Sequence, residues 1–196
     1  LCRNQLIKLL GCSSDSIFVI NMGRVCSQKN QIEAIQVGLN ILKKYPQTHF
    51  LFLGALQDSV YVNQICQKIN TSEYQDNFHI LGHIKDFIPY LLGSDILFHT
   101  SRTESQGRVI LEAMASKLPV IAYEVGGVGE AVVQGETGYL RPFGDIDGLA
   151  QDLGQLLESP TLRSTFGSAG YLRVQKYFTA ENTAMQVKNI LDKVLF

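Results

Sequence analysis

Five short, continuous apolar segments recur through the first two thirds of the chain. They are rich in Ile, Phe, Leu and Val and do not alternate with polar residues. Strands that are buried on both faces of a parallel sheet have this pattern. The predicted strands are Ile17–Asn21, Phe50–Leu53, Phe78–Leu81, Ile96–His99 and Pro119–Tyr123. Because both faces of such a sheet must be covered, few folds remain open to the chain.

Segments with helical periodicity separate and follow these strands, and a glycine-rich stretch from Gly126 to Gly144 indicates turns. Strand–helix alternation implies right-handed βαβ units. We therefore predict an α/β fold with a doubly wound, Rossmann-like parallel sheet and helices on both faces, forming one domain over residues 1–196. The expected helices are Ile32–Leu42, Val60–Ile69, Phe87–Leu92, Arg108–Ser116, Asp145–Glu158, Pro160–Tyr177 and Ala180–Leu195, the last capped by Thr179.

Composition excludes several classes of protein. The formal net charge is -1, so nothing in the overall charge attracts nucleic acid or acidic lipid. No apolar segment approaches the ~20 residues that span a bilayer, and no signal-peptide pattern opens the chain. The chain begins at Leu1, from which we expect a fragment of a longer protein.

Cysteine and histidine residues are scattered, without the local spacing of a metal site or a disulfide scaffold. We therefore expect no metal ligand among them, and a reducing cytosolic compartment. His49, His79 and His99 are expected to be hydrogen-bonded residues in or beside strands. The fourth histidine is His83, and the cysteines are Cys2, Cys12, Cys26 and Cys66.

The loop after the first predicted strand carries two cations. Ligands bind at the carboxyl ends of strands in an open parallel sheet, and Gly23, Arg24 and Lys29 lie at this edge. A diphosphate would satisfy both cations, with the arginine forking two oxygens and the lysine acting as a point charge. Two solvated surface cations are the alternative, and for this loop taken alone they are the commoner arrangement.

The loop after the fourth predicted strand and the helix that follows it carry two carboxylates, Glu104 and Glu112. The residues around Glu112 are apolar or small, which is typical of a buried helix, so its carboxylate needs a partner or a cavity. A ribose diol, a structural salt bridge and an exposed helix edge remain open for Glu112. The helical rise places the two carboxylates ~9 Å apart, and the amides of Gln106, Gly107 and Arg108 at the helix start favour an anion.

These segments together resemble the family 4 glycosyltransferases, which have the two-domain GT-B fold. The resemblance covers nearly the whole chain, with the motifs in the family's order. It rests on Gly23-Arg24…Lys29 (G-R-L-x-x-x-K), Glu104…Glu112 (E-x7-E), Val125–Glu130 (V-G-G-x-x-E) and Gly135–Leu140 (G-x-x-G-x-L). The chain departs from the pattern at Ser105 and Gln106, at Gly54–Gln57, at Lys117 and at Gly129.

The resemblance implies a role for each residue. Glu104 is the expected catalytic residue beside the donor sugar, and Arg24 and Lys29 would neutralise the diphosphate in place of a metal, so that no cofactor is expected. Glu112 would hold the ribose, and the backbone near His83 and Ile84 would read the base of a UDP- or GDP-sugar. The expected donor-binding residues are Gly23, Arg24, Lys29, His83, Ile84, Gln106, Gly107, Arg108, Val109 and Glu112.

The resemblance also implies a missing half. This chain would be the C-terminal, donor-binding domain of a retaining enzyme, and an absent N-terminal domain would bind the acceptor and make any membrane contact. The expected location is cytoplasmic, including the inner face of the membrane for the full-length protein. The last helix should expose apolar side chains that pack on the absent domain, namely Met185, Val187, Ile190, Leu191 and Val194.

Two other functions remain open. One is a nucleotide-sugar-binding module without catalysis, and the other is a nucleotide-sugar epimerase on the same two-domain fold. A dehydrogenase is disfavoured, because Gly126-Gly127-Val128-Gly129 follows the fifth strand rather than the first and lacks the G-x-G-x-x-G arrangement.

Overall fold

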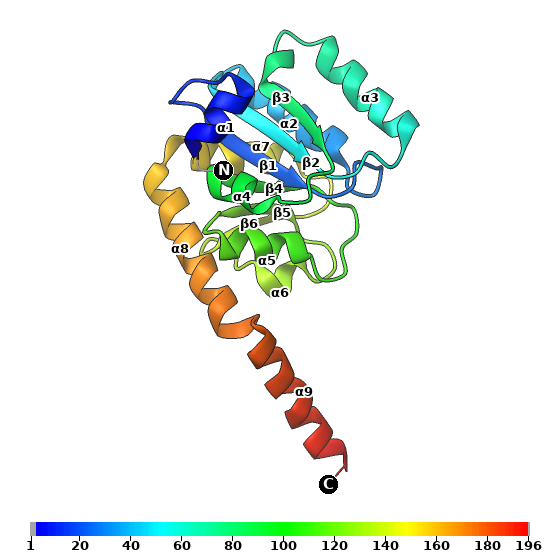
Figure 1. Ribbon diagram of the computed structural model, residues 1–196, viewed down its shortest axis with the longest axis vertical. Helices are drawn as coiled ribbons and strands as arrows, with labels where there is room; N and C mark the ends of the chain where they lie inside the picture. Colours follow the sequence, from blue (N-terminus) through cyan, green and yellow to red (C-terminus); the bar gives the residue numbers. More distant parts are fainter. Residues whose placement is uncertain (1–2, 196) are drawn as a thin grey trace.

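A computed structural model describes residues 3–195, except for the side chains of residues 186 and 193–195, and within this range it contains one six-stranded parallel sheet. Figure 1 shows the sheet between two layers of helices, with the C-terminal helix projecting away from the body. The strand order is β3-β2-β1-β4-β5-β6. The strands are β1 (Ile17–Met22), β2 (Thr48–Leu53), β3 (Phe78–Gly82), β4 (Ile96–His99), β5 (Val120–Tyr123) and β6 (Gly138–Arg141).

The five strands and the fold class predicted from the sequence are confirmed. The seven predicted helices are also present, within a few residues of their predicted bounds, and Thr179 Oγ1 caps the last one by accepting from the Asn182 amide. The helices are α1 (Arg3–Leu10), α2 (Gln31–Leu42), α3 (Ser59–Asn70), α4 (Ile88–Gly93), α5 (Arg108–Ala115), α6 (Val128–Ala131), α7 (Ile146–Glu158), α8 (Pro160–Tyr177) and α9 (Ala180–Leu195), with a 3₁₀ turn η1 (Gln75–Asn77).

The sequence analysis missed β6, α1 and α6. The stretch from Gly126 to Gly144, predicted to be rich in turns, also contains β6, which pairs with β5 in parallel register. The glycine that opens β6 is required by contact with its neighbour, because a Cβ on Gly138 would lie 2.1 Å from the carbonyl oxygen of Val120. In α1, Leu6 is fully buried and packs against the sheet.

Each face of the sheet has its own apolar core. On one face, side chains of α2, α3 and α7 pack against Val19, Phe50 and Phe98. On the other face, α1, α4, α5 and α6 pack against Phe18 and Leu51. Continuous apolar strands form because successive side chains point to opposite faces and both faces are buried.

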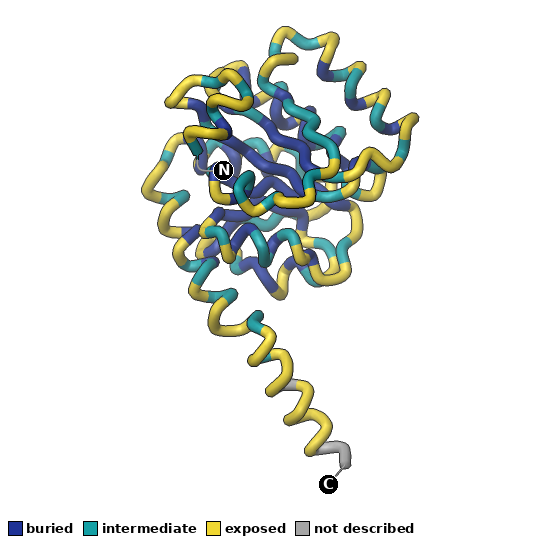
Figure 2. The backbone as a smooth tube through the Cα atoms, viewed as in Figure 1, coloured by how far each residue is buried: buried dark blue, intermediate teal, exposed yellow. Residues whose placement is uncertain are grey.

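The C-terminal helix α9 lies outside both cores. Figure 2 shows it exposed over most of its described part. Met185, Val187, Ile190 and Leu191 are each at least 50% exposed, so the expected apolar surface is confirmed at these four positions. The side chain of Val194 lies outside the described residues. Within the described part of the chain, no helix combines the length and hydrophobicity needed to cross a membrane.

A buried ion pair joins β6 to α7. Arg141 donates from Nε and Nη2 to the two carboxylate oxygens of Asp152, at 2.7 and 2.6 Å. The Asp152 side chain is only 1% exposed, whereas that of Arg141 is 28% exposed. A buried carboxylate is costly without its partner, so this pair should hold the edge strand on its helix.

Replacing Arg141 should therefore destabilise the domain strongly. We expect Arg141→Met to lower the free energy of unfolding by about 3 kcal/mol, because Asp152 stays buried without a counter-charge. Chemical denaturation measures this change. The matched control is Lys44→Met, which removes the exposed pair with Glu158 (70% and 55% exposed) and should leave the free energy of unfolding nearly unchanged. Equal losses in the two variants would contradict the assignment.

Candidate functional site

A cleft of about 660 Å³ opens at the carboxyl edge of the sheet. It lies where the strand order reverses between β1 and β4, so the loops that follow these strands diverge and leave a crevice. All eleven residues singled out from the sequence line this one cleft: Gly23, Arg24, Lys29, His83, Ile84, Glu104, Gln106, Gly107, Arg108, Val109 and Glu112. Residues up to 89 positions apart in the chain are thus gathered on a single surface.

Two glycines bring the loops after β1 and β2 into contact. Gly54 has φ +154, and a Cβ there would lie 1.9 Å from the carbonyl oxygen of Gly23. The Gly23 amide donates to the Leu53 carbonyl oxygen at 2.9 Å. Because the backbones touch, Gly54 cannot carry a side chain without moving the floor of the cleft.

Arg24 follows Gly23 at the base of the cleft, and its guanidinium group is exposed. Its Nη1 donates to Oε1 of Gln57 at 3.0 Å, and its carbonyl oxygen accepts from Nε2 of Gln31 at 3.0 Å. These two hydrogen bonds fix the orientation of both the main chain and the side chain of Arg24. Among the described residues, no carboxylate forms an ion pair with Arg24, so its charge is available to an anion in the cleft.

Unlike Arg24, Lys29 forms an ion pair within the protein. Its Nζ lies 2.6 Å from Oε2 of Glu104, and the two side chains are only 15% and 12% exposed. The sequence predicted both residues at this edge but not their contact, because 75 residues separate them. An anionic ligand must therefore compete with Glu104 for this ammonium group.

The Glu104 carboxylate also has a buried histidine beside it. Nε2 of His99 lies 3.6 Å from Oε2, just beyond hydrogen-bond distance. The neighbouring His99 ring and the Lys29 ammonium group lower the pKa of Glu104 to about 2, although burial by itself would raise it. Glu104 is therefore ionised at neutral pH.

Gly126 and Gly127, in the loop after β5, pack against the backbone of the loop that carries Glu104. Gly126 has φ +53, and a Cβ there would lie 1.7 Å from the carbonyl oxygen of Glu104. The Gly127 amide donates to the carbonyl oxygens of Glu104 and Ser105, at 3.4 and 3.2 Å. The sequence analysis identified these glycines by resemblance without giving them a role. Their role is to let the loop after β5 support the loop after β4.

Glu112 is half-buried and faces the cleft. Within residues 3–195, where side chains are described, its carboxylate has no hydrogen-bond or ion-pair partner. The structural salt bridge considered from the sequence is therefore absent from this part of the chain. The expectation of a helix buried all round was wrong, because α5 buries Ile110, Ala113 and Met114 and leaves its other side at the cleft and solvent.

The start of α5 points into the same cleft. Gly107 precedes the helix in a left-handed conformation (φ 65, ψ 49), and no side chain caps the helix. The first amides of a helix have no acceptor within it and attract anions. Gln106, Arg108 and Val109 line the cleft around this helix start.

The apolar part of the cleft was missed by the sequence analysis. It consists of residues that end strands β1 and β2 and of a side chain from the loop before α4. Met22, Gly54 and Ala55 directly follow the first two predicted strands, and this position, at the edge where ligands bind, was the signal for them. The additional lining residues are Met22, Leu53, Gly54, Ala55, Phe87 and Ser105.

The low pKa of Glu104 predicts a specific acid dependence of stability. The unfolded carboxyl, with a pKa of about 4.5, binds its proton at higher pH than the folded one at about 2. Its contribution to stability is therefore present above pH 4.5 and is lost as the pH falls from about 4.5 to 2. We expect the stability difference between wild type and Glu104→Gln, measured by urea denaturation, to shrink over this interval. Lys29→Met should weaken this dependence, and a constant difference would contradict the assignment.

Comparison with known proteins identifies one family over most of the chain. The family model for glycosyl transferases group 1 matches residues 3–173. An N-acetyl-alpha-D-glucosaminyl L-malate synthase from Bacillus anthracis is 30% identical over 191 residues, covering 97% of this chain and 49% of the relative. The capsular polysaccharide biosynthesis glycosyltransferase CapM from Staphylococcus aureus is 28% identical, covering 86% of this chain and 44% of that protein.

Solved structures of other proteins share the fold of this chain. Anabaena Alr3699/HepE in complex with UDP superposes with a TM-score of 0.88 and 25% identity, covering 97% of this chain and 52% of that one. Its complex with UDP-glucose gives 0.87 and 26%, with coverage of 97% and 52%. The chain spans about half the length of these proteins. On the extent of the family match and the shared fold, the chain belongs to the glycosyl transferases group 1 family.

Proposed function

We propose that this chain is the C-terminal, donor-binding domain of a retaining, metal-independent family 4 glycosyltransferase. Such an enzyme moves a sugar from a nucleoside diphosphate sugar to an acceptor. The observation that carries the proposal is one cleft that gathers three cations and two carboxylates at the reversal of strand order. The UDP and UDP-glucose complexes of a protein with the same fold support it.

The diphosphate of the donor would lie between Arg24, Lys29 and the start of α5. Arg24 offers a fork of donors to phosphate oxygens, and Lys29 a compact charge. Helix-start amides add further donors. These groups can balance the negative charge that develops on the departing diphosphate, which is the work that a metal ion performs in other transferases.

The ribose would be held by Glu112. Its carboxylate is without a protein partner in the described structure and faces the cleft from the wall formed by α5. Two ribose hydroxyls can donate to the two oxygens of one carboxylate, and hydrogen bonds to a charged acceptor are the stronger kind. A partly buried carboxylate without a partner raises the free energy of the protein that has no ligand. Hydrogen bonds from the ribose would remove this penalty when the donor binds.

Glu104 would lie beside the donor sugar and act through its charge. A carboxyl with a pKa of about 2 carries no proton to give at neutral pH, so it is unsuited to be the general acid. It can accept hydrogen bonds from sugar hydroxyls and stabilise positive charge on the anomeric carbon. The bond from that carbon to the diphosphate breaks with its electron pair on the phosphate oxygen. The acceptor oxygen attacks the same face, and its proton passes to that departing phosphate oxygen.

The base of the nucleotide would meet the loop after β3. The Gly54 amide donates to the Gly82 carbonyl oxygen at 2.9 Å, which brings this loop to the cleft, where His83 and Ile84 line the wall. Uracil or guanine would be read there by the backbone. The acceptor and any membrane contact would belong to the other half of the protein, which the exposed apolar face of α9 would contact. We place the full-length protein in the cytoplasm or at the inner face of the membrane.

Removal of the Glu112 carboxylate should weaken donor binding. We expect Glu112→Ala to raise the Kd for a UDP- or GDP-sugar about 10- to 100-fold, because charge-assisted hydrogen bonds to the ribose are lost. Calorimetry with a panel of both nucleotide classes measures the change. Glu136→Ala, at an exposed glutamate outside the cleft, is the matched control. Undiminished binding by Glu112→Ala, or no binding of any nucleotide by wild type, would refute the donor-site assignment.

Removal of the charge on Glu104 should separate binding from transfer. In the complete two-domain protein, Glu104→Gln frees Lys29 and removes a negative charge near the diphosphate. We therefore expect UDP or GDP affinity to be kept or increased, while sugar transfer falls at least 100-fold. Product analysis of the wild type tests the class of reaction. Binding without products would indicate a non-catalytic module, and free sugar or nucleotide without an extended acceptor would indicate an epimerase.

A further inference from the structure

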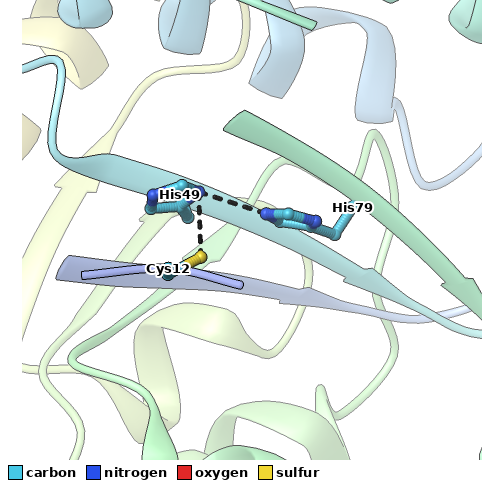
Figure 3. Close-up of side chains that lie close together, drawn as sticks. All are labelled: Cys12, His49 and His79. Carbon is cyan, nitrogen blue, oxygen red and sulfur yellow. Dashed lines mark hydrogen bonds between the residues drawn. The ribbon is translucent and has the colours of Figure 1, made fainter. Parts of the chain in front are cut away.

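Three side chains with metal-binding atoms meet at the amino edge of the sheet, opposite the cleft. Figure 3 shows dashed lines from His49 to both Cys12 and His79. Nδ1 of His49 lies 3.5 Å from Sγ of Cys12 and 3.1 Å from Nε2 of His79. The three atoms all lie within 4.8 Å of one another, and this is the one such group among the described residues.

The parallel sheet places the two histidines together. His79 is the register partner of Leu51, which lies two residues after His49 on the neighbouring strand. Side chains two residues apart share one face of a strand, so the two rings are diagonal neighbours on the same face of the sheet. Cys12 joins them from the turn after α1, which covers that face.

The distances suit a tetrahedral ion. Zinc bonds of about 2.0–2.1 Å to nitrogen and 2.3 Å to sulfur place tetrahedral ligand atoms about 3.3 Å apart for two nitrogens and about 3.6 Å for nitrogen and sulfur. The observed separations of 3.1 and 3.5 Å differ from these by a few tenths of an ångström. Both contacts converge on one atom, Nδ1 of His49, and the Cys12 thiol also donates to the carbonyl oxygen of Leu10 at 3.6 Å.

The surroundings favour ligation and leave room for a fourth ligand. Imidazole nitrogen and thiolate sulfur are common ligands of Zn²⁺, and all three side chains are only partly buried. A groove of about 490 Å³ opens onto the three side chains, so water can reach the remaining position.

We propose that Cys12, His49 and His79 form a binding site for one Zn²⁺ ion, with water as the fourth ligand. The Cys12 thiol releases its proton to solvent as the sulfur–zinc bond forms, and no electron is transferred. The ion would tie the turn after α1 to β2 and to the edge strand β3. This site is separate from the donor cleft and does not depend on the proposed transferase function.

The experiment uses the untagged chain, stripped with a chelator and titrated with ZnCl₂ and, separately, with CoCl₂. We expect one ion bound per chain and a rise in Tm of roughly 5 °C at a hundredfold excess over Kd. With Co²⁺ we expect a sulfur-to-metal charge-transfer band, which reports the Cys12 thiolate, and intense visible bands typical of tetrahedral coordination.

Variants separate the cluster from accidental binding elsewhere. Cys12→Ser should abolish the charge-transfer band, and His79→Gln should weaken Zn²⁺ binding at least tenfold. Cys66→Ser, at a half-buried cysteine on α3 outside the cluster, should bind like the wild type. Far-UV circular dichroism checks that each variant is folded. A wild-type chain without the cobalt band or the Tm shift, or a folded Cys12→Ser variant that keeps both, would overturn the proposal.

Discussion

β1 and β4 pair in parallel at the centre of the sheet, through Val19 with Ile96 and Ile20 with Leu97. A buried Asn21 side chain reinforces this pairing by donating to the Phe98 carbonyl oxygen at 2.7 Å. Strands on one side of this pair follow the order β1, β2, β3, and on the other side β4, β5, β6. The loops after β1 and β4 therefore diverge, and the cleft exists because nothing in the sheet fills the space between them.

Backbone contact and charge then shape this crevice. Gly54 and Gly126 let neighbouring loops touch, so that the positions of Arg24 and Glu104 depend on main-chain packing rather than on flexible side chains. Lys29 and Glu104 neutralise each other in the free protein. A phosphate ligand that takes the ammonium group would leave Glu104 free to interact with the sugar, so diphosphate binding and preparation of the carboxylate would be coupled in one step.

The two edges of the sheet differ in chemistry. The carboxyl edge holds charged groups and helix starts, which suit an anionic nucleotide. The amino edge holds two histidines and a thiol, which suit a borderline-soft cation. Both sites arise because a parallel sheet brings equivalent ends of distant strands together.

The sequence by itself determined the α/β class and five of the six strands, because short apolar runs are local signals. The residues of the candidate site followed from loop positions after these runs together with the resemblance to glycosyltransferases. It did not reveal β6, whose Gly138-Tyr139-Leu140-Arg141 lacks an apolar run and forms a strand by pairing with β5. Only the tertiary structure showed that Lys29 contacts Glu104, that Glu112 has no protein partner in the described chain, and that Cys12 meets His49 and His79. These contacts join residues 30 or more positions apart, where neither helical nor strand periodicity relates one side chain to another.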